Sequence, residues 1–517
     1  MVDNNRSTVL NGNFSLSAKL RKISLTSSLL FNYNEGIRDY FVPSTLNAGS
    51  SYISSYFGFS QRLAINNAAR YTLDLDKDNQ ISFDLGQSLQ GDTHKYNYAR
   101  AYNGPNDYVK LISVDGRSTI NGATNGAYLN ANASGTQFYV FRYIDKELSN
   151  LMSFYGSARY DYKNILSVSA LLRRDGASNG QPDSRWVTTP AFSAKWNLKE
   201  QFAKQSKIID GLNFNAGWGR TLRIFLDDRF AAGPQYRSEN GWDQEPTIPG
   251  YIGFLGINRP YSSGFVGYGL SLPYADRTSF TLDGEFLKNR LSLALTAYNR
   301  NDKRGALALP VPQETGYSSN YQSGLDINNK GIELLASVNL LREKTNLTWT
   351  TGINLSYNRN KLTALPNGLT ELIYQNDNKL VVGKSVGSYW LYTNEGIYNN
   401  DAEVPLGRTF NGIPMSAGDP KFVDYNGDNV IDDQDKVLTG DRLPKFVGGW
   451  NNTIVYKNFD LNFNLIFAAG QKAINQYDAN RYGFVNREAS SDITAAREIT
   501  SWQTFDNENS YPMYNPW

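Results

Sequence analysis

The stretch FDLNFNLIF, residues 459–467, decides the fold, because apolar and polar side chains alternate along it. Successive residues of a β-strand point to opposite faces, so this period of two predicts a strand with one apolar and one polar face. Phe459, Leu461 and Phe463 lie on the apolar face, and Asp460 and Asn462 lie on the polar face. The same alternation predicts strands within residues 10–20, 23–33, 291–298 and 346–358.

Short and long connections take turns along the chain. The short ones are predicted at 21–22, 76–79, 163–164, 288–290, 342–345 and 457–458, with a longer one near 199–211. The long ones are predicted at 34–60, 89–150, 173–187, 222–275, 301–330 and 358–449. Roughly seven hairpins follow, and hence at least about 14 strands. A transmembrane barrel sorts its connections in this way, with short periplasmic turns and long extracellular loops.

The sequence therefore predicts an all-β protein, an antiparallel transmembrane β-barrel that is incomplete in this chain, with long extracellular loops. Asn, Ser, Thr and Tyr on the polar face suit a water-filled interior, and ring closure leaves no unpaired strand edge in lipid. The alternative is a large soluble β-protein, such as stacked sandwiches or a propeller. No internal repeat with the period of a propeller blade is visible.

Composition excludes several classes of function. Among 517 residues, 51 Lys+Arg balance 49 Asp+Glu, a net charge of 51 − 49 = +2, so no basic excess favours nucleic acid. Cysteine is absent, which excludes disulfides and thiolate metal sites, and His94 is the single histidine.

The sequence contains no run of about 18 apolar residues, so no membrane helix is predicted, and residues 1–20 predict no signal peptide. The mean hydropathy of −0.49 is compatible with a barrel, since only alternate strand residues face lipid.

Four segments resemble the SusC/RagA family of TonB-dependent outer-membrane transporters. The first, residues 155–176, is a strand–turn–strand that ends in RRDG, and the second, Leu309–Leu335, has a Pro-rich loop and an NKGIE strand start. Val381–Tyr398 is similar to a family segment rich in spaced glycines. The strongest match is Gly418–Leu461, which has an acidic loop, a G-x-x-x-P-K-F element at 440–446 and a YKNFD turn.

The resemblance implies a protein of the bacterial outer membrane that imports a nutrient, an oligosaccharide or a peptide. It also implies a SusD-like surface lipoprotein as a lid, and TonB acting through a plug domain. The chain shows no plug or TonB box before its first strand, and residues 501–517 lack the alternation of a closing strand. We therefore expect residues 1–517 to form part of a barrel that has about 22 strands in this family.

Residues 418–441 contain an acidic loop with the spacing of a calcium site. Counting from Asp424, oxygen-bearing residues occupy positions one, three, five, nine and twelve, and position seven can supply a backbone carbonyl. The predicted ligands are Asp424, Asn426, Asp428, Val430, Asp432 and Asp435. Position six is Asn429 in place of the usual glycine, and asparagine enters the left-handed region more readily than most residues. The alternative is a solvated loop of Asx-turns without metal.

Other candidate sites are weaker. Aromatic rings stack on sugars and on peptide side chains, so the 222–275 connection offers candidate substrate contacts at Trp242, Tyr251, Tyr261 and Tyr268. The alternative is that these rings pack the loop or its lid. His94 is predicted to be exposed at the start of a long loop. No nucleophile–base pair is visible, so we expect no enzyme. The competing function is a soluble or surface-exposed β-rich binding protein with a calcium-stabilised loop.

Overall fold

The computed structural model describes residues 1–47, 51–102, 139–223, 265–312, 319–341, 347–375 and 378–475, together with a few isolated positions. The chain forms two compact units, Met1–Asn328 and Asn329–Trp517. Nearly all regular structure in the described residues is antiparallel β, and ladders join fourteen strands there. The predicted fold class is confirmed. Within the same residues, no helix is long and apolar enough to cross a membrane.

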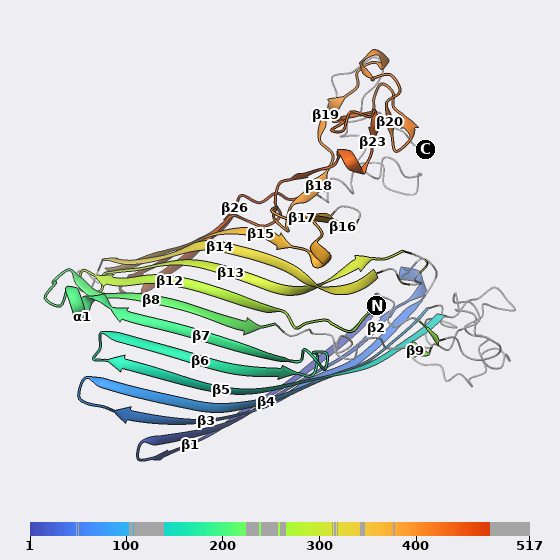
Figure 1. Cartoon of the computed structure of the whole chain (residues 1–517). Helices are drawn as coiled ribbons and strands as arrows, with labels where there is room; N and C mark the ends of the chain where they lie inside the picture. The colour runs from blue at the N-terminus through green and yellow to red at the C-terminus, as the bar shows by residue number, and fades with distance from the viewer. Residues whose placement is uncertain are drawn as a thin grey trace, which may run out of the picture. The chain divides into compact units, whose positions relative to one another are not determined.

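Unit 1 consists mainly of long strands that lie side by side in chain order (Figure 1). They are β1 (Val2–Leu20), β2 (Ile23–Val42), β3 (Tyr52–Asp74), β4 (Asn79–Tyr102), β5 (Tyr139–Tyr162), β6 (Leu166–Ala177), β7 (Trp186–Asn197), β8 (Ile209–Leu222), β12 (Tyr274–Phe286), β13 (Leu291–Pro310) and β14 (Ser319–Leu341). Each pairs with its neighbour in this order. The smaller elements are η1 (Ser44–Leu46), α1 (Leu198–Phe202), β9 (Arg237–Ser238), β10 (Ile257–Asn258) and β11 (Phe265–Val266).

Unit 2 contains the second part of β14 and three further long strands, β15 (Leu347–Ala364), β25 (Phe446–Tyr456) and β26 (Phe459–Ala469). Small sheets fill the connection from β15 to β25. Their elements are η4 (Pro366–Gly368), β16 (Glu371–Gln375), β17 (Asn378–Val381), β18 (Tyr389–Leu391), β19 (Asn394–Ile397), η5 (Asp401–Glu403), β20 (Thr409–Phe410), β21 (Ile413–Pro414), β22 (Pro420–Phe422), β23 (Val430–Ile431), η6 (Asp433–Asp435) and β24 (Val437–Thr439). The longest predicted connection is therefore an ordered substructure.

Strand register confirms the alternation read from the sequence. Leu29 of β2 lies opposite Ile65 of β3, which lies opposite Leu89 of β4, which in turn lies opposite Met152 of β5. Directly opposed residues share one face of a sheet, so these side chains form an apolar row across four strands. The next row toward the tight turns is polar and lies on the other face; it consists of Ser28, Asn66, Ser88 and Ser153.

The apolar face is uncovered. Leu85, Phe192 and Phe280 lie on it and keep 67%, 55% and 50% of their surface exposed. A water-soluble monomer does not leave so many large apolar side chains exposed in one continuous face. The same arrangement is favourable if the face contacts lipid.

Tight turns close the hairpins at one end of the strands. Arg21, Lys163 and Lys457 each begin such a turn with positive φ, 54°, 50° and 54°. The turns at Arg21 and Lys457 have two residues and the turn at Lys163 has three. Short hairpin loops use left-handed backbone to match the twist of the strands, which explains these values in residues that rarely adopt them. These predicted turns are confirmed. The turn predicted at 342–345 lies outside the described residues.

The long connections are shorter than the sequence predicted. The β4–β5 ladder continues to the pair Tyr102–Tyr139, so the connection predicted at 89–150 covers only the residues between them. Likewise β2 reaches Val42, and β3 begins at Tyr52. The ends of β4 and β5 are mostly polar on both faces, whereas β2 and β3 still pair there through apolar residues, among them Phe41 and Ile53, which form a small buried cluster. In β4 and β5 backbone pairing continues without a hydropathy signal, which is why the connection at 89–150 was predicted to be too long.

Candidate functional site

The polar face of the strands carries charged pairs in cross-strand register. Arg62 Nε and Asp92 Oδ1 are 2.7 Å apart, and Arg70 Nε and Asp84 Oδ1 are 2.6 Å apart. Both pairs are bidentate, because the second guanidinium nitrogen of each arginine also donates to its partner carboxylate. Exposed pairs of this kind add little stability. These pairs show that the polar face of the strands is charged and hydrated, whereas the opposite face is apolar.

A hollow of about 580 Å³ opens on this polar face, with His94 in its lining. His94 lies within β4, so the prediction of a loop position was wrong, and its side chain is exposed as predicted. The Oδ1 atom of Asn32, also in the lining, is buried and has no hydrogen-bond partner among the described residues. Ser149 lines the hollow opposite Asp92. Such an array of donors and acceptors suits a polar solute.

The RRDG motif alternates between the two faces of β6. Asp175 is 5% exposed, and its Oδ1 accepts from Ser153 Oγ and from Arg173 Nε, both at 2.6 Å. Its Oδ2 accepts from Thr189 Oγ1 at 3.0 Å. Arg173 and Asp175 thus tie three strands together on the polar face. Arg174 points the other way, and its guanidinium lies 5.8 Å from the centre of the Trp186 ring.

The first half of the acidic loop has the backbone shape of the predicted motif. Asn429, at position six, adopts φ 64°, the left-handed conformation for which glycine is usual. Asp424 Oδ2 accepts from the Asn429 N–H at 3.0 Å, and Asp424 Oδ1 accepts from the Gly427 N–H at 2.6 Å. Asp428 Oδ1 accepts from the Val430 N–H at 2.7 Å. The loop is therefore curled around its acidic side chains.

The second half of the loop is fixed by a buried carboxylate. Asp435 is fully buried, and its two oxygens accept from the N–H groups of Tyr425 and Asp432 at 2.8 and 3.0 Å. Asp432 in turn accepts from the Gln434 N–H at 2.8 Å and caps η6. These bonds hold residues 425–435 together.

A guanidinium also faces the loop. Arg408 Nη2 lies 3.4 Å from Asp424 Oδ2, and both side chains are nearly buried. Arg408 Nε is buried and makes no hydrogen bond among the described residues. The acidic charge of Asp424 is therefore partly balanced by an arginine. No group of three or more His, Cys, Asp or Glu in the described part of the chain is arranged to hold a metal.

The donor set nevertheless fits calcium in its chemistry. The candidate ligand atoms are all oxygens, which this hard cation prefers. The Asn429 and Ile431 carbonyls accept from the N–H groups of Thr409 and Asn411 in β20–β23 pairing. Successive carbonyls of a strand alternate in direction, so the Val430 carbonyl points away from β20. Carboxylates that now accept backbone N–H groups would have to reorient toward an ion.

Aromatic rings surround a lysine next to the loop. Lys436 Nζ lies 4.8 Å from the Trp390 ring centre, 5.0 Å from the Tyr392 ring centre and 2.8 Å from Asp433 Oδ1. Trp390 is 1% exposed and donates from Nε1 to the Lys436 carbonyl. Burial raises the pKa of Tyr392 above its ordinary value, and the Lys436 charge opposes this. This packing gives the substructure its own small core.

No family model matches the chain. The chain is 25% identical over 528 residues to TonB-dependent receptor P39 of Formosa agariphila, an alignment of 92% of the chain and 46% of that protein. It is 25% identical over 403 residues to TonB-dependent receptor SusC of Bacteroides thetaiotaomicron, covering 72% of the chain and 38% of that protein. The chain is similar in sequence to TonB-dependent receptors of the SusC/RagA kind.

Solved structures support the same SusC/RagA-like fold. The RagAB peptide transporter superimposes with a TM-score of 0.78 at 15% identity, covering 99% of this chain and 53% of that one. A RagAB peptide importer in an 'open-open' state gives a TM-score of 0.74 at 14% identity, with 99% and 52% covered. The SusC/RagA-like chain thus spans about half the length, or less, of the relatives it matches.

The predicted aromatic contacts of this SusC/RagA-like chain are mostly untested. Trp242, Tyr251 and Tyr261 lie outside the described residues. Tyr268 follows β11 and is 77% exposed. Sequence reasoning missed the hollow near His94. The polar alternation of β4 could have revealed it, had that strand been extended past residue 89.

Proposed function

We propose that the protein imports a nutrient, an oligosaccharide or a peptide, across the outer membrane, along the polar face of its strands. The observation that carries this proposal is the register, which puts apolar side chains on one face and polar side chains on the other through successive antiparallel strands. An apolar outside and a wet inside are what a transporting barrel requires. The similarity to SusC and RagAB supports the same proposal.

The proposal includes two partners. A SusD-like surface lipoprotein would close the barrel from outside by docking on the ordered substructure between β15 and β25. TonB would supply energy through a plug domain, which none of the described strands forms. The relatives are receptors and transporters, not enzymes, which supports the expectation that the chain is not catalytic.

A tryptophan inserted on the polar face should block uptake. Ser149 and Leu148 are neighbours in β5 and both border the polar hollow, but Ser149 lies on the polar face, opposite Asp92, and Leu148 is 48% exposed on the apolar face, opposite Thr93. Ser149→Trp should therefore reduce uptake of labelled oligosaccharide or peptide severalfold, whereas Leu148→Trp should leave it near the wild-type rate. Uptake is measured in cells that lack the natural gene and carry each variant. Unchanged uptake in Ser149→Trp cells, at equal surface abundance, contradicts passage along this face.

We further propose that the acidic loop binds one calcium ion. Asp424, Asn426, Asp428 and Asp435 would contribute side-chain oxygens, Val430 its carbonyl, and Asp432 an oxygen directly or through water. The spacing, the left-handed Asn429 and the all-oxygen donor set support this proposal. An ion would relieve repulsion among five acids within twelve residues, a charge that Arg408 balances only in part. Its role would be structural, fixing the loop where a lid docks.

Removal of calcium should loosen this loop and leave the strands intact. Chelation is expected to raise protease cleavage within residues 418–441, and Asp424→Ala with Asp428→Ala should reproduce that effect. Asp433→Asn is the matched control, since Asp433 is an exposed acid outside the proposed ligand set. Limited proteolysis with and without added calcium measures the effect. A calcium-replete crystal structure with only water among these oxygens refutes the site.

A further inference from the structure

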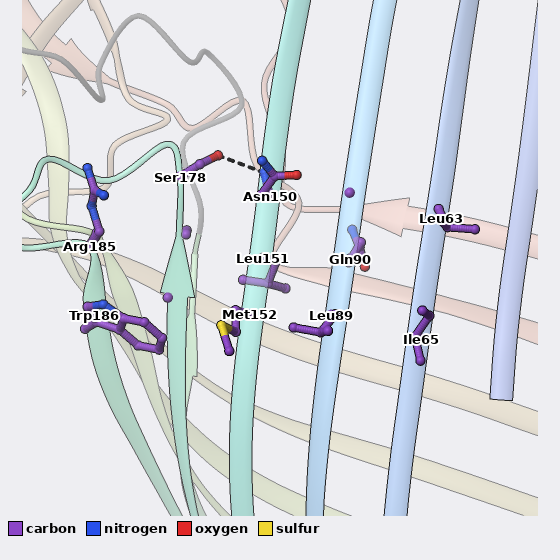
Figure 2. Close-up of a pocket in the computed structure, with 13 residues that line it drawn as sticks. Leu63, Ile65, Leu89, Gln90, Asn150, Leu151, Met152, Ser178, Arg185 and Trp186 are labelled. Carbon is purple, nitrogen blue, oxygen red and sulfur yellow. Dashed lines mark hydrogen bonds between the residues drawn. The ribbon is translucent and has the colours of Figure 1, made fainter. Parts of the chain in front are cut away.

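A second hollow, of about 450 Å³, opens on the apolar face near the loop end of β3 to β7. Its apolar lining comes from five strands, and Figure 2 shows Leu63, Ile65, Leu89, Met152 and Trp186 around it. All five sit at apolar-face positions in the strand register. The proposed transport path, on the polar face, does not use this hollow.

The hollow has an aromatic wall built on a glycine. Trp186 lies opposite Gly176 in register, and a Cβ on Gly176 would lie 2.8 Å from the Trp186 ring. The ring therefore rests flat on the backbone of β6, a position that any larger residue would disturb. Arg174, two residues along β6, places its guanidinium 5.8 Å from the same ring centre. A cation therefore lies beside the aromatic wall of this hollow, although Arg174 is not itself among the lining residues.

The position along the strand puts this hollow at a membrane surface. Arg174 follows the tight turn at Lys163 by 11 residues. At roughly 3.3 Å per residue and a tilt of about 40°, this separation is on the order of 28 Å, close to the height of about 25 Å of the apolar band. The tight turns are periplasmic in such barrels, so the hollow lies at the outer leaflet, at the boundary of acyl chains and headgroups.

The positive charge at this boundary has no acidic partner in the part of the chain that the structure describes. No ion pair joins Arg174 or Arg185 to a carboxylate there, and Arg185 Nε is buried without a hydrogen bond. Cations at a lipid boundary are favourable beside anionic headgroups.

We propose that this hollow binds one phosphate-bearing lipid of the outer leaflet. Its acyl chain would lie against Leu89, Met152 and the Trp186 ring, and its phosphate would accept hydrogen bonds from Arg174, with Arg185 as a second cation at the rim. Guanidinium groups recognise phosphate oxygens through paired N–H donors, which explains the arginine at this position. The lipid would brace β6 and β7 from outside.

Native mass spectrometry of the delipidated full-length protein tests this assignment, with dioleoyl phosphatidic acid as the probe and dioleoyl phosphatidylcholine as the comparison. We expect the protein to retain one molecule of phosphatidic acid in preference to phosphatidylcholine. Arg174→Gln and Arg185→Gln should each weaken its retention by about fivefold. Arg159→Gln is the matched control, because Arg159 is an exposed arginine of β5 on the polar face.

Three results would overturn the assignment. They are equal retention of the two lipids, equal loss in Arg159→Gln, and displacement of the lipid by inorganic phosphate, which would indicate a free-phosphate site. If Arg174→Gln fails to assemble, Arg185→Gln carries the same test. Heat-modifiable migration in gels identifies the variants that are folded.

Discussion

Asp175→Ala should lower the free energy of unfolding by about 2–4 kcal/mol, because it leaves a partly buried guanidinium and two hydroxyls without their acceptor. Asp175 accepts hydrogen bonds from Arg173, Ser153 and Thr189, and Ser153 and Thr189 are 0% and 5% exposed. Arg173 is 34% exposed, which lets water replace part of the lost interaction. Denaturant-induced unfolding of the protein in lipid vesicles measures the change.

Asp161→Ala provides a matched control. Arg159 and Asp161 have the same spacing of two along a strand and lie on the same polar face, but Arg159 is 57% exposed. Loss of the Arg159–Asp161 pair should lower the free energy of unfolding by less than about 1 kcal/mol, as for surface pairs in general. If Asp175→Ala is no more destabilising than Asp161→Ala, the buried network does not hold these strands together.

Phe463→Arg should lower the free energy of unfolding by roughly 2–4 kcal/mol if this side chain faces the middle of the bilayer. Phe463 lies at the centre of β26, opposite Asn452, and its ring packs edge-on against Trp450 with centroids 5.7 Å apart. The arginine would place a charge in lipid and remove this aromatic contact. Unfolding of the variant in vesicles, compared with the parent protein, gives the difference.

Asn464→Arg is the control for that substitution. Asn464 is the next residue of β26 and points to the polar face, so an arginine there can remain hydrated. Its cost should be well below that of Phe463→Arg. Equal costs at the two positions would mean that both faces of β26 have the same surroundings, which argues against the barrel.

The strands that cross the apolar band were predictable, because lipid on one side and water on the other impose a strict period of two. Phe459, Leu461 and Phe463 show this directly. The ends of β4 and β5 were not predictable in the same way, since both of their faces are mostly polar there and backbone pairing leaves no hydropathy pattern. This is why His94 was placed in a loop although it belongs to β4.

The contacts of each RRDG residue could not be predicted from the sequence and were found only in the structure. The sequence marked residues 173–176 as a family-like motif, but alternation alone does not say which neighbours Asp175 contacts. Its partners Ser153 and Thr189 come from β5 and β7, and cross-strand register decides that they meet. In the acidic loop, by contrast, residue spacing predicted the local backbone, including the left-handed Asn429. Arg408, sixteen residues away in sequence from Asp424, was not predicted.

Cysteine labelling from outside the cell tests the central claim, that these strands cross the outer membrane with tight turns on one side and long segments on the other. The 517 residues contain no cysteine, so each introduced thiol reports its own position in them. Leu406, 99% exposed, lies in the substructure between β15 and β25, and Asn164 lies in a tight turn. A membrane-impermeant maleimide should label Leu406→Cys in intact cells, and Asn164→Cys only after the outer membrane is permeabilised. Labelling of Asn164→Cys in intact cells while Leu406→Cys stays protected would contradict the account.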